Sequence, residues 1–134
     1  MSRSQLATKT SIAEARHYPN IEVEPLTGSV GALVNGVQIA DALENDALFA
    51  DIHQAWLDYQ VLFFRDQELA PDQQLALGEK FGEIQKLGYA PSLEDHEGVW
   101  VQEYPDLYEG IVADIDWHAD STFRPCPTRG SLLY

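Results

Sequence analysis

The chain has 134 residues, and its 22 acidic and 8 basic side chains give a formal net charge of −14. This length suits one domain, and so acidic a chain is a poor partner for nucleic-acid phosphates or anionic membranes. Hydrophobic residues make up 45% of the chain, too many for a disordered protein. No apolar run approaches the roughly 20 residues that a transmembrane helix needs.

The single cysteine, Cys126, excludes an intrachain disulfide and a cysteine-based metal site. The N-terminal residues lack the apolar core of a signal peptide. Both features predict a cytoplasmic protein, because disulfides are rare in reducing compartments.

The first part of the chain predicts a polar tail followed by short strands. We expect residues 1–17 to form a flexible tail and residues 18–134 to form the folded region. Apolar and acidic residues alternate over Ile21–Glu24, which indicates a half-buried strand. A second strand is predicted at Gly31–Val34 and, after an Asn-Gly turn, extended chain resumes over Val37–Ile39.

A helix is predicted from Asn45 or Asp46, either of which can cap it, to about Tyr59. Its apolar face has helical spacing and consists of Leu48, Ile52, Ala55 and Trp56. His53 lies beside that face, where a histidine is far more often a surface residue than a ligand. The short apolar run Val61–Phe64 then fits a strand buried on both faces.

A second helix is predicted over residues 70–81. Pro71 suits the first helical position, and Asp72 places a negative charge in the first turn, where it complements the helix dipole. Gly82 suits a left-handed C-cap. The residues predicted to line one face are Leu75, Gly78 and Phe81.

Periodicity is weak over residues 83–116, where glycine and proline recur. We expect a long loop region with two short strands, Val99–Val101 and Ile111–Ala113. Gly130–Tyr134 begins another apolar strand and the sequence stops within it, which predicts a truncated chain.

The stretch Asp116–Phe123 carries the strongest chemical signal, because it places His118 two positions before Asp120. In an extended backbone these side chains point the same way, as two ligands of a 2-His-1-carboxylate iron site would. Trp117 and Phe123 give them an apolar frame, in which polar groups need partners that a metal can provide. No histidine follows His118, so the third ligand is not supplied locally.

Four stretches, in this order, resemble the taurine dioxygenase/2,4-dichlorophenoxyacetate dioxygenase family. They are the Gly-rich segment 27–32, the strand 60–67, the helix and following turn 71–83, and Trp117–Phe123. Members of the family are Fe(II)- and 2-oxoglutarate-dependent oxygenases. The resemblance implies an α+β fold built on a double-stranded β-helix (jelly roll) with flanking helices, which is incomplete in this chain.

The resemblance also implies that His118 and Asp120 are the first two Fe(II) ligands. It implies that 2-oxoglutarate and O₂ are cosubstrates and that a small organic acid or sulfonate is hydroxylated. The family's distal histidine and its 2-oxoglutarate-binding arginine have no counterpart in the sequence. We therefore expect the 134-residue chain alone to be inactive.

The substrate-binding residues implied by the resemblance are Tyr89, Asp114 and Ser121. Leu87 stands where taurine dioxygenases have a histidine, and Asp114 stands where they have an asparagine. An acid at that position repels a sulfonate, which disfavours taurine itself as the substrate.

Two other functions stay open on the sequence alone. The chain is either a truncated, catalytically inactive fragment or interaction module, or a two-ligand site that binds metal weakly without turnover. The sequence does not decide whether the protein forms a homo-oligomer.

Overall fold

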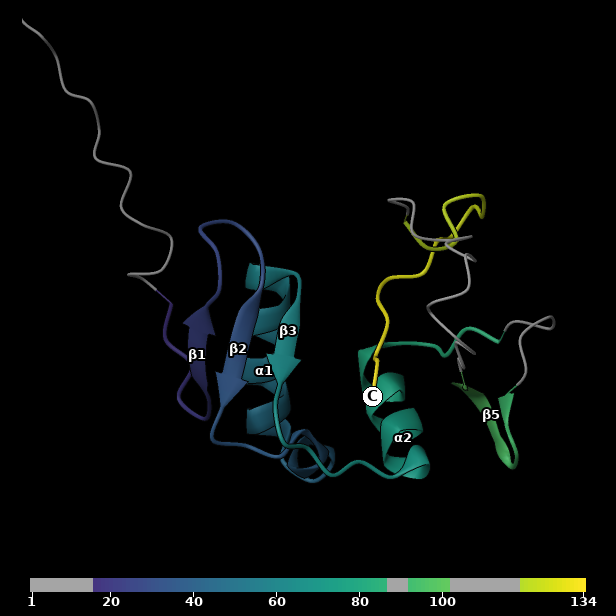
Figure 1. The fold of residues 1–134 in the computed structure, drawn as a ribbon, viewed down its shortest axis with the longest axis horizontal. Coiled ribbons are helices and arrows are strands. Elements are labelled where there is room, and N and C mark those ends of the chain that lie inside the picture. The colour runs from purple at the N-terminus through teal and green to yellow at the C-terminus, as the bar shows by residue number, and fades with distance from the viewer. Residues whose placement is uncertain (1–15, 87–91, 102–118) are drawn as a thin grey trace, which may run out of the picture. The chain divides into compact units, whose positions relative to one another are not determined.

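The computed structural model describes residues 16–86, 92–101 and 119–134 (Figure 1). The chain divides into two compact units, the first ending at Glu68 and the second beginning at Leu69. Both are built from short strands and helices, which gives a mixed α/β architecture with two small sheets. The predicted tail lies outside the described residues up to position 15.

The first unit contains a three-stranded sheet in the order β1 (Glu22–Pro25), β2 (Ala32–Asn35) and β3 (Leu62–Phe64). β1 and β2 are antiparallel, whereas β2 and β3 are parallel. A parallel pair needs a crossover, and helix α1 (Asp46–Tyr59) supplies it and lies across one face of the sheet (Figure 1). The two predicted N-terminal strands are therefore confirmed, each one residue later than expected.

Helix α1 confirms the sequence prediction at both ends. The Asn45 side chain caps it by accepting a hydrogen bond from the backbone N–H of Leu48 at 3.0 Å. The buried residues follow helical spacing and are Leu48, Ile52, Ala55 and Tyr59. Trp56 is only half-buried and meets the ring of His53 edge-on at a centroid distance of 5.8 Å. His53 is therefore a half-buried residue on the side of the helix, as predicted.

The segment before α1 differs from prediction. Extended chain was expected up to Ile39, but Ile39 instead begins the 3₁₀ helix η2 (Ile39–Leu43). The cause is a tertiary contact, because Gln67 Oε1 accepts a hydrogen bond from the Ile39 backbone N–H at 2.6 Å. Gln67 also donates to the carbonyl oxygens of Val37 and Arg65, at 3.2 and 2.7 Å. This glutamine joins the chain after β2 to the chain after β3.

The prediction that residues 61–64 are buried on both faces is wrong. β3 lies at the edge of the sheet, and the Phe63 side chain is 41% exposed. On β2, by contrast, Ala32 and Val34 are almost fully buried on alternate positions. An apolar run indicates that a segment is at least partly buried, but it does not indicate whether a second layer of structure covers the other face of the strand.

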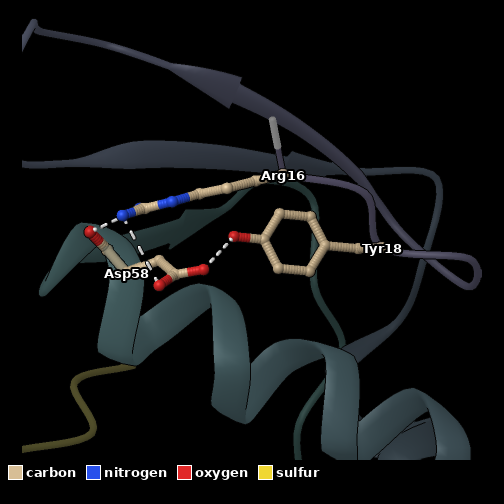
Figure 2. A network of polar contacts seen from close by, with 3 residues as sticks. All are labelled: Arg16, Tyr18 and Asp58. Atoms are coloured by element: carbon tan, nitrogen blue, oxygen red, sulfur yellow. Dashed lines mark hydrogen bonds and ion pairs between the residues drawn. The ribbon is translucent and has the colours of Figure 1, made fainter. Parts of the chain in front are cut away.

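Residues 16–18 are held to α1 by a polar network centred on Asp58 (Figure 2). Tyr18 donates its hydroxyl hydrogen to Asp58 Oδ2 at 2.7 Å, and Arg16 Nη1 donates to the Asp58 carbonyl oxygen at 2.9 Å. Arg16 Nη2 also lies 3.6 Å from Asp58 Oδ1, and the guanidinium lies over the ring of Tyr59. Arg16, predicted to be part of a loose tail, is thus an anchored residue.

This network predicts an alkaline limit to stability. Burial and the neighbouring Asp58 carboxylate raise the pKa of Tyr18 well above its ordinary value of 10.0. Above that pH the unfolded chain loses the Tyr18 proton while the folded chain keeps it, so the free energy of unfolding falls as pH rises. We expect Tyr18→Phe to flatten this fall when urea denaturation is measured between neutral pH and pH values above 10.0. An equally steep fall in the variant would contradict the assignment.

The second unit contains α2 (Pro71–Phe81) and a hairpin of β4 (Ser92–Leu93) and β5 (His96–Trp100). The predicted helix is confirmed, with Pro71 at its start and Gln73 Oε1 accepting from the backbone N–H of Ala70 at 2.9 Å. Its only fully buried residue is Leu77, which lies outside the predicted apolar face.

Other details of the second unit correct the prediction. Gly82 ends α2 with a φ of 158°, which is not the left-handed conformation of the expected cap. The strand predicted at residues 99–101 begins earlier, at His96, and ends at Trp100. Residues 130–134 form no strand, and Leu133 is 89% exposed. The predicted strand at residues 111–113 lies outside the described part of the chain.

Of the helices in the described part of the chain, none combines the length and apolar character that crossing a bilayer requires.

Candidate metal centre

The predicted site falls partly within the described structure. His118, Asp114 and Tyr89 lie outside the described residues, whereas Asp120 and Ser121 lie inside them. The structure therefore describes the surroundings of the Asp120 carboxylate, which involve three segments of the second unit: α2, the chain at Gln85 and residues 119–134.

The backbone at Asp120 is not extended as expected. Residues 120–123 form a turn, in which the backbone N–H of Arg124 donates to the Ser121 carbonyl oxygen at 3.0 Å. Ser121 has a φ of 55°, in the left-handed region that residues with a Cβ adopt infrequently. Asp120 thus opens a turn, and its direction depends on what holds that turn.

The Asp120 carboxylate is exposed and accepts a hydrogen bond from the hydroxyl of Ser131, with 3.3 Å between Oγ and Oδ2. Ser131 lies eleven residues further along the chain, in a segment for which the sequence predicted only an apolar strand. A donor of this kind is typical of the outer contacts that orient a metal-binding carboxylate.

Gln85 makes long-range contacts to the loop that begins with this turn. Its Oε1 accepts hydrogen bonds from the Ser121 hydroxyl at 3.3 Å and from the Thr128 hydroxyl at 2.5 Å. These contacts bridge 36 and 43 residues of sequence. Sequence analysis missed Gln85, because a glutamine in an aperiodic segment carries no local signal for a partner so distant.

The C-terminal residues are also tied to α2, since Gln74 Nε2 donates to the carbonyl oxygen of Leu132 at 3.1 Å. Within the described residues, the segment that carries Asp120 is therefore tied to other parts of the second unit through Gln85 and Gln74, and Ser131 joins its C-terminal part to Asp120. A carboxylate on a loop fixed in this way is suited to a defined coordination geometry.

The histidines upstream of the motif have other surroundings. His96 Nε2 lies 3.0 Å from Asp72 Oδ1, and its Nδ1 lies 2.8 Å from the Glu94 carbonyl oxygen. His53 packs between the rings of Phe49 and Trp56 on α1. Both environments are structural, which agrees with the sequence-based view that neither residue is the distal ligand.

The residues available suit Fe(II) in kind. An exposed carboxylate such as Asp120, oriented by a hydroxyl donor, can serve as an oxygen ligand. Within residues 16–86, 92–101 and 119–134, no group of three or more His, Cys, Asp or Glu side chains is placed to hold a metal ion. His118 is not among those residues.

Comparison with known proteins shows the family of the chain. Residues 22–134 match the family model described as "Taurine catabolism dioxygenase TauD, TfdA family". The chain belongs to this family. The match includes the His118-x-Asp120 stretch and confirms the resemblance inferred from the sequence.

Two curated relatives are named for different substrates. The (S)-phenoxypropionate/alpha-ketoglutarate-dioxygenase of Delftia acidovorans is 35% identical over 121 residues, which cover 84% of this chain and 41% of that protein. An alkylsulfatase of Acinetobacter baylyi is 31% identical over 114 residues, covering 84% of this chain and 34% of that protein. The chain thus spans well under half the length of either relative.

A solved structure supports the likeness in three dimensions. The structure of AAD-2 in complex with Mn(II) and N-oxalylglycine matches with a TM-score of 0.56 and 25% sequence identity. The match covers 80% of this chain and 34% of that one. The described residues of this chain form a mixed α/β arrangement with two small sheets, and a complete jelly roll is not among their elements.

Proposed function

We propose that this chain supplies the first two metal ligands, His118 and Asp120, of an Fe(II)- and 2-oxoglutarate-dependent dioxygenase. The observation that carries the proposal is the family match over residues 22–134, which includes the His-x-Asp stretch. The contact from Ser131 to Asp120 supports it, because a ligand carboxylate needs an orienting donor.

The two residues have complementary roles. His118 supplies a neutral imidazole nitrogen, and Asp120 supplies a negatively charged oxygen, the pair of donors that a 2-His-1-carboxylate iron site takes from one short stretch of chain. When bound, Fe(II) would activate O₂, the oxidant, with 2-oxoglutarate as the co-substrate that supplies electrons, and the protein's side chains cannot perform this chemistry. The chain's own residues hold the ligands in place and position the substrate beside them.

For the substrate we propose a small organic anion, either a carboxylic acid or a sulfur oxyacid derivative. The relatives named above act, by their names, on phenoxypropionate and on alkyl sulfates. A third relative, from Pseudomonas putida, is named as an alpha-ketoglutarate-dependent sulfate ester dioxygenase. Tyr89, Asp114 and Ser121 are the residues that we propose to contact the substrate.

Metal binding by the chain tests the proposal directly. Because the sequence holds no histidine after His118, we expect weak Co(II) binding that tightens when free imidazole is added as a substitute third ligand. Adding 2-oxoglutarate to this mixture under anaerobic conditions should change the visible Co(II) spectrum, since the oxoacid chelates the metal. The measurements are isothermal titration and absorption spectroscopy.

The assignment has clear failure conditions. It is wrong if the visible Co(II) spectrum does not change when 2-oxoglutarate is added at millimolar concentration. It is also wrong if the His118→Ala variant binds Co(II) with the same affinity as the parent chain. Glutarate, which lacks the 2-oxo group, is the matched control ligand, because it cannot chelate through a keto oxygen. It should leave the spectrum unchanged.

A second candidate is a non-catalytic interaction module, and one observation favours it. Several apolar side chains of the described residues are exposed, including Val61 at 44%, Phe63 at 41% and Leu133 at 89%. Val61 and Phe63 are close in the sequence, and contiguous exposed apolar surface is a feature of association sites. Light scattering that shows self-association or partner binding, together with no response to metal, would favour this reading over the enzyme.

A further inference from the structure

The turn that carries Asp120 depends on a residue from a distant part of the chain. Ser121 takes a left-handed conformation with a φ of 55°, which side chains with a Cβ disfavour. Such a conformation persists only where the surroundings impose it. The Ser121 hydroxyl donates a hydrogen bond to Gln85 Oε1 at 3.3 Å.

Gln85 also holds the other end of the same loop. Its Oε1 accepts from Thr128 at 2.5 Å, so one oxygen atom joins Ser121, the residue after Asp120, to a residue seven positions further on. Both contacts are partly buried, where hydrogen bonds are less weakened by water. Three residues beyond Thr128 lies Ser131, the donor to the Asp120 carboxylate.

We propose that Gln85 is a positioning residue for the metal site. By accepting hydrogen bonds from Ser121 and Thr128 it closes the loop between Asp120 and Ser131, and this closure sets the direction in which the Asp120 carboxylate points. Gln85 touches neither metal nor substrate in this proposal. The inference rests on the proposed function, because it concerns the orientation of a proposed metal ligand.

The test compares Co(II) binding by Gln85→Leu and the parent chain in the presence of imidazole. Leucine fills similar space but cannot accept a hydrogen bond, so the loop loses both contacts. We expect affinity for Co(II) to fall by about 10-fold, the lower end of the range for loss of an outer contact to a metal ligand, because Gln85 acts on Asp120 through the loop and not directly. We also expect the visible Co(II) spectrum to change, because the carboxylate direction alters the coordination geometry.

Matched variants separate positioning from general stability. Gln54→Leu makes the same chemical change on the exposed side of α1, and it should leave Co(II) affinity and spectrum unaltered. Gln85→Glu keeps an acceptor oxygen and should restore the parental spectrum. In a Ser121→Gly background, glycine adopts the left-handed conformation unaided. There, Gln85→Leu should have a smaller effect than in the parent chain.

The outcomes are distinct. If Gln85→Leu is unfolded by circular dichroism, Thr128→Val takes its place, because it removes one hydroxyl donor at nearly constant shape. A folded variant with parental affinity and spectrum would overturn the inference alone. If the parent chain binds no Co(II), or binds it without dependence on Asp120, the proposed function itself is wrong.

Discussion

Replacement of Asp120 by alanine is expected to abolish measurable Co(II) binding by the chain, even with imidazole present. Asp120 is the only carboxylate in the proposed ligand set, and its loss leaves His118 as the sole protein ligand. Because loss of an outer contact alone costs about 10–100-fold in metal affinity, removing a direct ligand should cost more than about 100-fold. Isothermal titration with Co(II) measures this loss.

The control for Asp120→Ala is Glu83→Ala, which removes one negative charge from an exposed residue of the same unit. This variant should bind Co(II) as the parent chain does, since the net charge of −14 falls by only one. Asp120→Asn gives a second comparison. It keeps an oxygen that can accept from Ser131 but carries no charge, so it should bind far more weakly than the parent. Equal binding by Asp120→Ala and Glu83→Ala would show that the metal site lies elsewhere.

The largest effect on stability is expected for Ile52→Ala. Ile52 lies on the buried face of α1 and is 1% exposed, so truncation removes buried methyl groups and leaves a cavity beside the sheet. Substitutions of this type lower the free energy of unfolding by about 2–5 kcal/mol. Since small domains often have total stabilities of only about 5–15 kcal/mol, a loss of this size is readily measured by urea denaturation.

Leu57→Ala is the matched control for Ile52→Ala on the same helix. Leu57 is 52% exposed, so its truncation should change the free energy of unfolding by only about 0.5 kcal/mol. If both variants were equally stable, α1 would not pack through the face that contains Ile52. Far-ultraviolet circular dichroism follows the transition in both cases.

The elements predicted correctly from sequence are those set by contacts within one or two helical turns. Asn45 caps α1 because its side chain reaches an N–H only three residues away. Pro71 begins α2 because its ring favours helical φ and it lacks the N–H that a first turn leaves unpaired. The His118-x-Asp120 pair, which stays a prediction, was recognised in the sequence because its two members lie within three residues.

Features that depend on a second segment were mispredicted or missed. Ile39 was expected in extended chain, but its N–H binds the Gln67 side chain, 28 residues away, and a 3₁₀ helix begins there. Leu77 is fully buried although the apolar spacing favoured Leu75, Gly78 and Phe81, none of which is fully buried. Apolar periodicity indicates that one face of a helix will be buried, but the segments that pack against the helix decide which side chains lie on that face.

By itself, the sequence determined the helices α1 and α2, the short strands of the first unit and the His118-x-Asp120 stretch by which the family is recognised. These depend on backbone preferences and on spacing within a few residues.

Only the tertiary structure decided that β3 is an exposed edge, that Asp120 opens a turn, and that Gln85 and Ser131 hold it. The reason is that the exposure of an edge strand and the partners of a side chain depend on contacts between segments tens of residues apart. Such contacts produce no repeating pattern in the sequence.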